Sequence, residues 1–298
     1  ILPKLISGSI ALSEEGQTIE PYFTIEIPAI MGVMSALTLA FILGIGLSKI
    51  KNSTMLKVVD EFNKIVLMIV TNVLIPLVPI YIGCVFAKLS YSGEIFSTLK
   101  SFGIVYILLF SLQLVYIVIQ YCIAGAIKKE NPFKLIKNMI PAYMTAVGTQ
   151  SSAATIPVNV ECAKNNGVSK EIREFCVPLC ATIHLSGSII SVTSFAVAVL
   201  MMNGMDHGFS TVFPFILMLG IAMVAAPGAP GGAIMSALPF LPMIGIPSDG
   251  GLASLMIALY LTQDSFGTAA NVSGDNAIAA VVDHLNKKWS KKADNKVA

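Results

Sequence analysis

The feature that most constrains this chain is a series of apolar runs, each long enough to cross a lipid bilayer. About 20 apolar residues span the hydrocarbon layer. The composition agrees, because 55% of the residues are hydrophobic, 12% are charged and the mean hydropathy is +0.79, whereas soluble domains are about 25% charged. The sequence therefore predicts an all-α integral membrane protein. The runs fall at 28–48, 62–87, 102–126, 175–202 and 250–283.

Lysine placement predicts how these spans are oriented. Short cytoplasmic loops carry an excess of Lys and Arg, and the chain has no such residue from Glu174 to Asn286. We expect four basic clusters to be cytoplasmic, residues 1–27 to be the remnant of an extracellular loop and residues 287–298 to be a cytoplasmic tail. The clusters are Lys49, Lys51 and Lys57; Lys128, Lys129, Lys134 and Lys137; Lys164, Lys170 and Arg173; and Lys287, Lys288, Lys291 and Lys292.

Two segments do not fit a single crossing. Residues 132–165 begin and end at cytoplasmic clusters, and residues 210–247 begin and end on the outer side by the same logic. Both are interrupted in the middle, by Gly148 and Pro157 in the first segment and by the Pro- and Gly-rich stretch 227–232 in the second. Irregular backbone at membrane depth persists only where it is buried in protein or lines a cavity. The pattern predicts two re-entrant helical hairpins, one from each side, as in transporters built from inverted repeats.

The last apolar run carries polar side chains in a single stripe. Asp264, Thr268, Asn271 and Asp275 are spaced at i, i+4, i+7 and i+11, so a helix aligns them on one face. A carboxylate in the bilayer core costs several kcal/mol and normally faces a cavity, an ion or a partner. The stripe therefore predicts one wall of a binding site for a small polar ligand.

Four motifs in order resemble the dicarboxylate/amino acid:cation symporter family, the glutamate transporter homologues. The resemblance runs from about residue 28 to the end of the chain. It is closest to the serine/threonine symporter branch in the last motif, which resembles the family's eighth span. The other motifs resemble the first hairpin, the seventh span and the tip of the second hairpin. In chain order they read TQSSAATIPVNVECAKNNGVSKEI, CATIHLSGS, GAPGGAIM and QDSFGTAANVSGD.

The resemblance implies the glutamate-transporter-homologue fold, with inverted repeats, an elevator-like moving core and a homotrimer in the plasma membrane. Residues 28–127 are then transmembrane helices of the scaffold and the sixth span, and the family's first three spans are expected before Ile1. Residues 128–286 are the transport core. It comprises hairpin 1 at 132–165, span 7 at 170–203, hairpin 2 at 210–247 and span 8 at 249–286.

The resemblance also assigns roles to residues of the stripe. Asp264 matches the residue that holds the substrate's amino group, Thr268 assists it, and Asn271 matches the residue that binds the substrate carboxylate. These assignments suit the chemistry, since a carboxylate pairs with an ammonium and an amide donates to a carboxylate. The predicted substrate-binding set is Ser151, Ser152, Ser188, Pro230, Gly231, Asp264, Gly267, Thr268 and Asn271.

A sodium site is expected beside the substrate, because Asp275 matches a sodium ligand of the family. Hard cations favour oxygen ligands. Thr182 matches a ligand of a second sodium ion, and Cys180 falls where the family uses a backbone carbonyl. The predicted metal set is Cys180, Thr182, His184, Asn271 and Asp275.

Two departures from the family pattern favour a neutral substrate. Acidic amino acid transporters place an Arg at the position of Gly267, or in some members at that of Gln150. Without a guanidinium, a second substrate carboxylate would be costly to hold in a buried site. We therefore expect a serine-, threonine- or alanine-like substrate, with a dicarboxylate, glutamate or aspartate as the alternative.

A third departure concerns the coupling ion. The family's Asn-Met-Asp-Gly-Thr pattern reads His184-Leu185-Ser186-Gly187-Ser188, which replaces an amide and a carboxylate that serve sodium sites. Sodium is favoured, and a proton on His184 is the alternative. A channel and a non-transporting binding homologue also stay open. No enzyme motif, cofactor motif or nucleic-acid groove is found, so the expected partners are an amino acid, the coupling ion and membrane lipid.

Overall fold

The computed structural model describes residues 33–50, 53–69, 95–224, 226, 228 and 230–297, with scattered positions between 72 and 91. The predicted loop remnant at 1–27 and part of the predicted span at 62–87 lie outside the described residues. Within the described ranges every regular element is a helix, which confirms the all-α prediction.

The chain divides into two units, and the smaller one, Ile10–Ser97, contains helices α2 (Val33–Ser48) and α3 (Thr54–Ile69). α2 carries no charged residue, and its side chains Phe41, Ile42 and Ile45 are 49–63% exposed. Apolar side chains this exposed indicate an apolar environment around the helix.

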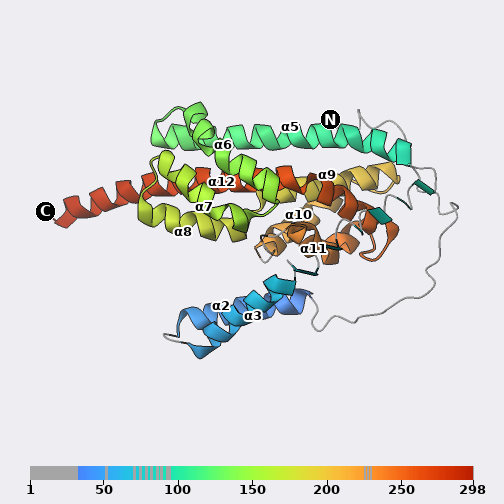
Figure 1. Ribbon diagram of the computed structural model, residues 1–298, viewed down its shortest axis with the longest axis horizontal. Helices are drawn as coiled ribbons and strands as arrows, with labels where there is room; N and C mark the ends of the chain where they lie inside the picture. Colours follow the sequence, from blue (N-terminus) through green and yellow to red (C-terminus); the bar gives the residue numbers. More distant parts are fainter. Residues whose placement is uncertain are drawn as a thin grey trace. The chain divides into compact units, whose positions relative to one another are not determined.

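The larger unit contains the remaining helices, and α12 packs against α6, α7, α8 and α9 within it (Figure 1). Small side chains allow this close approach, since Ala269, Ala270 and Ala280 of α12 are fully buried; small residues are typical of helix contacts in membranes. The helices are α5 (Ile95–Lys128), α6 (Pro132–Thr149), α7 (Ser152–Asn165), α8 (Lys170–Ile183), α9 (Ser186–Met202), α10 (Phe209–Met223), α11 (Gly232–Ala237), the 3-10 helix η2 (Leu238–Ile244) and α12 (Gly251–Val297).

Two stretches among the described residues are long and apolar enough to cross a membrane. One is Phe102–Lys128 in α5 and the other is Lys170–Met202, which includes α8 and α9. The exposed side of α5 is strongly apolar, with Ile107 71% and Val115 56% exposed. A lipid-facing helix has this pattern, because lipid tails are as apolar as these side chains.

Residues 132–165 form a helix–turn–helix, α6 and α7, whose bounds coincide with those of the first predicted hairpin. Asn131 caps the start of α6 by accepting from the Phe133 N–H, and Gln150, which follows its last residue, has a left-handed φ of 52°. Ser151 caps α7 by accepting from the Ala154 N–H. These caps satisfy backbone groups that the helix ends leave free. The insertion of this helix–turn–helix into a membrane stays a prediction.

The second predicted hairpin, 210–247, enters as α10 and returns as the shorter α11 and η2, which both pack against α10. Gly231 starts the return with a left-handed φ of 74°, a conformation that glycine adopts without steric cost. α12 then continues as one helix to Val297, through the lysines of the predicted tail.

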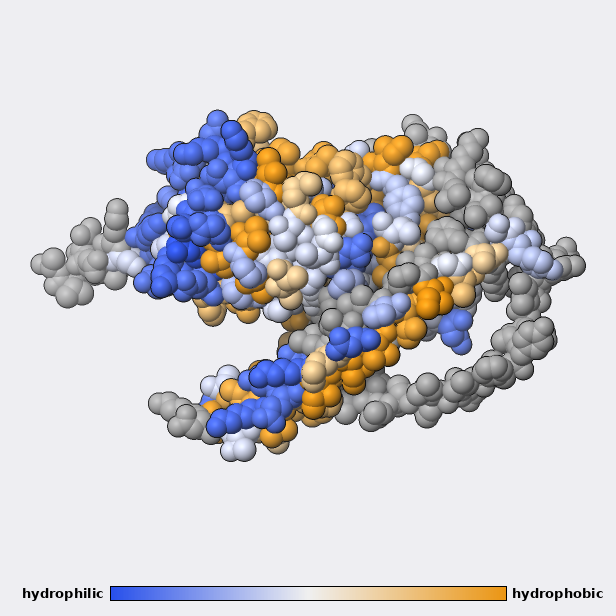
Figure 2. Space-filling model, viewed as in Figure 1, coloured by the Kyte–Doolittle hydropathy of each residue, from blue (hydrophilic) through white to orange (hydrophobic). Residues whose placement is uncertain are grey.

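Hydrogen bonds join three of the basic clusters at one end of this unit. The Lys128 ammonium donates to the Asn166 carbonyl, and the Lys287 ammonium donates to the Gly167 carbonyl at 3.4 Å. Figure 2 shows hydrophilic side chains gathered at the end where α6 begins and α7 ends, and apolar side chains over much of the remaining visible face. The basic clusters were predicted to be on the same, cytoplasmic side of the membrane, and that requires them to lie at the same end of the helices.

Candidate functional site

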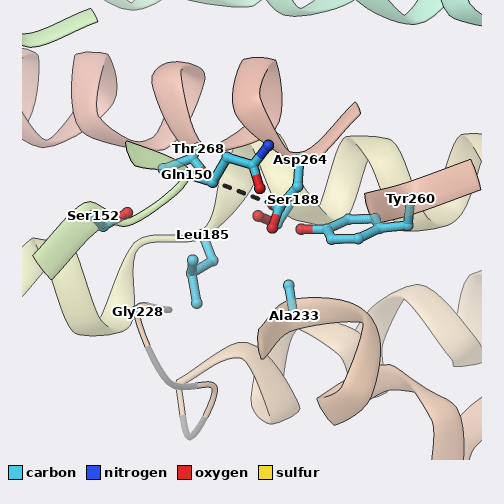
Figure 3. A pocket seen from close by; sticks show the side chains of 9 residues that line it. All are labelled: Gln150, Ser152, Leu185, Ser188, Gly228, Ala233, Tyr260, Asp264 and Thr268. Carbon is cyan, nitrogen blue, oxygen red and sulfur yellow. Dashed lines mark hydrogen bonds between the residues drawn. The ribbon is translucent and has the colours of Figure 1, made fainter. Parts of the chain in front are cut away.

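A small polar pocket lies where the start of α7, the start of α9 and the middle of α12 come together (Figure 3). Asp264 and Thr268 of the α12 stripe face it, and both are buried. It has room for about one water molecule. The pocket is lined by Gln150, Ser152, Leu185, Ser188, Gly228, Ala233, Tyr260, Asp264 and Thr268.

The Asp264 carboxylate is the charged group of this pocket, and it is 3% exposed. Its Oδ2 accepts from the Gly231 N–H at 2.7 Å, and its Oδ1 accepts from the Thr268 hydroxyl at 3.4 Å (Figure 3 shows the latter bond). Tyr260, one turn earlier, has a buried hydroxyl without a well-formed hydrogen bond among the described residues. Both of these donors are neutral, so the charge of the buried carboxylate is not balanced by them and a cationic partner would be favoured.

The segment between α10 and α11 lies against the start of α7. The Ser151 hydroxyl donates to the Gly228 carbonyl at 2.7 Å, and the Ala153 N–H donates to the same carbonyl at 3.5 Å. Together with the Gly231–Asp264 bond, these contacts close the pocket on the side of the second predicted hairpin. Of this segment, Pro230 is half-buried.

Asn271 lies one turn beyond Thr268 and is bonded to the start of α9. Its Oδ1 accepts from the N–H groups of Gly187 at 2.7 Å and Ser188 at 3.3 Å, and its Nδ2 donates to the Ser188 hydroxyl at 2.9 Å. The amide thus caps a helix that lacks a side-chain cap of its own. Asn271 reaches the pocket through Ser188.

Asp275, at the far end of the stripe, pairs with a histidine. Its Oδ1 is 2.9 Å from His184 Nδ1, and His184 Nε2 is 3.0 Å from the Ser186 hydroxyl. Asp275 Oδ2 is buried and has no hydrogen-bond partner among the described residues, and the same holds for Gln120 Oε1 on α5. An added Cβ at Gly274 would meet both the His184 and the Gln120 side chains. Two unpaired acceptor oxygens near a histidine are chemically suited to a cation.

The other predicted metal residues are placed differently. The Thr182 side chain is exposed and its hydroxyl donates to the Leu179 carbonyl at 2.8 Å, as hydroxyls in membrane helices commonly do. The Cys180 carbonyl accepts from the His184 N–H at 2.8 Å, and its thiol lies 3.9 Å from the Cys176 sulfur. Their role in holding sodium stays a prediction.

Gly267 faces α9 and α5. A Cβ built at this position would lie 3.2 Å from the Ser191 hydroxyl, 3.7 Å from Gln113 Nε2 and 3.8 Å from Gln263 Oε1. The position is therefore bounded by polar side chains, one turn along α12 from Asp264.

A family model described as "Sodium:dicarboxylate symporter family" matches residues 4–285. The chain belongs to the sodium:dicarboxylate symporter family. This is a family of membrane transporters, not of enzymes, and its description names sodium as the coupling ion.

This chain aligns with curated relatives over only part of its own length and of theirs. Excitatory amino acid transporter 1 of Rattus norvegicus is 31% identical over 169 residues, which is 56% of this chain and 31% of the relative. Neutral amino acid transporter A of Homo sapiens is 31% identical over 171 residues, 57% of this chain and 32% of the relative. The aligned part thus spans about a third of each relative.

Several pocket residues of this chain were missed by the sequence reasoning. Tyr260 is four residues before Asp264 and therefore extends the stripe by one turn, a signal present in the sequence. Leu185 and Ala233 carry no polar group, so only the packing of α9 and α11 beside α12 identifies them. The missed lining residues are Leu185, Gly228, Ala233 and Tyr260, whereas Gln150 was considered only as a position where some family members carry an Arg.

Proposed function

We propose that this chain forms the transport core of a secondary active symporter that moves a neutral amino acid together with a cation across the plasma membrane. The observation that carries the proposal is the charge of the pocket. It has one buried carboxylate, Asp264, and no lysine or arginine among its lining residues.

Asp264 is the proposed partner of the substrate's amino group. An ammonium can replace the Gly231 N–H as donor to Oδ2 and gain the stronger, charge-assisted hydrogen bond. Thr268 holds the other oxygen of the carboxylate and so fixes its orientation.

Two helix starts are the proposed partners of the substrate's carboxylate. α7 begins at Ser152 and α9 at Ser186, and Ser152 and Ser188 both line the pocket. Helix N-termini carry a partial positive charge, which favours a bound anion. It does so even though Asn271, Ser151 and the Gly228 carbonyl already accept from N–H groups of these first turns. An α-amino acid can therefore satisfy Asp264 with one end and these helix starts with the other.

The same charge balance supports a neutral side chain on the substrate. A glutamate or aspartate would bring a second carboxylate into a pocket whose lining offers no cationic side chain. A buried charge without a partner costs several kcal/mol. Serine, threonine and alanine are the substrates that fit this balance.

Asp275 is the proposed cation ligand, through Oδ2. This oxygen is buried and unpaired among the described residues, whereas Oδ1 is engaged by His184. Sodium is proposed ahead of a proton, in agreement with the family's description. The second candidate function is a proton-coupled symporter or a binding protein that has lost transport, and the His184–Asp275 pair is the observation that favours it.

Substrate entry requires the segment around Gly228 and Gly231 to move, because the pocket holds about one water molecule. We also propose, from the family and the lysine clusters, a multi-pass homotrimer with a cytoplasmic C-terminus. Neither the orientation nor the assembly is needed for the chemistry of the pocket.

Uptake by proteoliposomes that hold the full-length protein tests the function. A panel of serine, threonine, alanine, aspartate and glutamate is assayed with the sodium gradient and the pH gradient varied separately. We expect uphill uptake of the neutral amino acids on a sodium gradient. Preferred uptake of aspartate or glutamate would overturn the substrate assignment, and binding without uphill uptake would support the non-transporting alternative.

A further inference from the structure

A chain of polar side chains lies beside Gly267, outside the lining of the pocket. Gln113 on α5, Ser191 on α9 and Gln263 on α12 are 2%, 0% and 3% exposed. Gln263 Nε2 donates to Gln113 Oε1 at 3.0 Å, Gln113 Nε2 donates to the Ser191 hydroxyl at 3.0 Å, and Ser191 donates to the Gly187 carbonyl at 2.9 Å.

The last hydrogen bond of this series fixes which group donates and which accepts in each of the others. Because the Gly187 carbonyl can only accept, the Ser191 hydroxyl donates its one hydrogen to that carbonyl. It must therefore accept from Gln113. Gln113 then presents its oxygen to Gln263, which must donate. The orientation of both carboxamides follows from the hydrogen bonds.

One acceptor oxygen has no donor, and it belongs to Gln263, the first residue of this hydrogen-bonded series. Gln263 Oε1 is buried and has no hydrogen-bond partner among the described residues. It lies 3.8 Å from the place where a side chain at residue 267 would begin, and that residue is a glycine. A buried oxygen without a donor costs about 1–3 kcal/mol, so the native protein is expected to supply a donor during its function.

The pocket and this acceptor are neighbours along two helices. Gln263 precedes Asp264, Gly267 follows it by one turn, and Ser191 follows the pocket residue Ser188 by one turn. A ligand whose amino group is held by Asp264 therefore lies within about one helical turn of Gln263.

We propose that Gln263 Oε1, oriented by Gln113 and Ser191 and covered by no side chain at residue 267, accepts a hydrogen bond from the substrate's side chain. The subsite takes a neutral donor, the hydroxyl of serine or threonine or an amide N–H. It discriminates against alanine, which has no donor, and against a carboxylate, which offers only acceptors. This inference rests on the proposed function and names the determinant of its substrate class.

Gln263→Leu tests the subsite, because leucine keeps approximately the volume and removes the acceptor. In proteoliposomes with the full-length protein, we expect the KM for serine and threonine to rise about tenfold, the effect of one net hydrogen bond. The KM for alanine is expected to change less than about twofold on the same basis. The readout is the ratio of the serine and alanine KM values.

Gly267→Ala is the second variant and keeps every polar side chain of the network. Its added methyl lies between Ser191 and Gln263, so threonine uptake should fall more than serine uptake and serine more than alanine. Asn138→Leu is the matched control. It removes an amide from a separate network with Asn165 and Asn166, and the serine-to-alanine ratio should stay at the native value.

The outcomes separate this inference from the proposed function. If the native protein takes up none of the three amino acids, the proposed function is overturned. If uptake is present and both the Gln263 and Gly267 variants change serine and alanine equally, or not at all, the subsite is overturned. A Gln263 oxygen bonded only to a buried water would give that second result.

Discussion

The two carboxylates of the α12 stripe, Asp264 and Asp275, differ in what they are bonded to, although both are almost fully buried. Asp264 accepts from a backbone N–H and a threonine hydroxyl, whereas Asp275 accepts from an imidazole and keeps one oxygen unpaired among the described residues. A carboxylate held by neutral donors suits the proposed pairing with a substrate ammonium, and a histidine-paired one suits the proposed coupling role. The two ends of the stripe therefore differ in their chemistry.

Asp264→Asn is expected to weaken amino acid binding at least about 30-fold, since loss of one partner from a buried charge pair costs roughly 2 kcal/mol or more. Binding to the purified protein is measured by ligand-induced thermal shift. Asp206→Asn, in an exposed loop, is the control and should bind as the native protein does. Equal affinity of the native and Asp264→Asn proteins would rule out the assigned role.

His184→Asn is expected to shift coupling toward sodium. The substitution removes the imidazole from Asp275 and supplies an amide oxygen, a better ligand for a hard cation. Uptake is compared at fixed pH with the sodium gradient varied, and at fixed sodium with the pH gradient varied. A variant with the same dependence on both gradients as the native protein would contradict a coupling role for His184.

At the scale of elements, the break between α8 and α9 brings α9 into close contact with α12. α8 ends at Ile183 and α9 begins at Ser186, so Asn271 of α12 can cap the new helix start. The contact depends on Gly187, where an added Cβ would lie 2.4 Å from the Gly267 carbonyl oxygen and 2.7 Å from the Ala270 Cβ. A backbone oxygen cannot move aside as a flexible side chain can.

Gly187→Ala should therefore destabilise the packing of α9 on α12 by about 2 kcal/mol, within the range seen for overpacked cores. The measurement is the midpoint of thermal unfolding in detergent. Gly103→Ala on α5 is the matched control, because a Cβ there meets nothing within 4 Å, and alanine favours a helix. Equal midpoints for the two variants would show that the close approach is not needed.

Ser151→Ala should loosen the segment that closes the pocket. It removes the cap of α7, worth about 1 kcal/mol, and the bond to the Gly228 carbonyl. Faster hydrogen exchange is expected at the backbone amides of residues 231–237. Thr145→Ala removes a hydroxyl that bonds only within α6 and should leave that exchange unchanged; a similar increase in both variants would point to a general loss of stability.

At the scale of the whole molecule, three of the basic clusters lie at one end of the larger unit. The end of α5 and the C-terminal part of α12 both bond to the loop between α7 and α8, through Lys128 and Lys287. Because these clusters share one end of the larger unit, one topology satisfies all of them.

A C-terminal fusion tests that topology. Green fluorescent protein fused after Ala298 should fluoresce, and alkaline phosphatase at the same place should be inactive, since the first folds in the cytoplasm and the second outside it. The reverse pattern is expected for fusions in the loop at residues 204–208. An active phosphatase at the C-terminus would invert the proposed orientation.

Much of the fold followed from the sequence, because hydrophobic length and lysine placement act locally along the chain. The bounds of α6 and α7 are an example, since Pro132 and the Ser151 cap mark them. The continuation of α12 through the lysines of the tail was not foreseen. A charge cluster predicts the end of a span, and not the end of a helix.

The sequence by itself determined the class of protein, the stripe with Asp264 and Asp275, and the absence of a basic side chain at residue 267, because spacing along a helix fixes which residues share a face. Only the tertiary structure decided what meets that face. The pairing of His184 with Asp275, the capping of α9 by Asn271 and the chain from Gln263 to Ser191 each join residues that are 72 or more positions apart. Such contacts depend on how the helices pack around α12, which the local pattern does not encode.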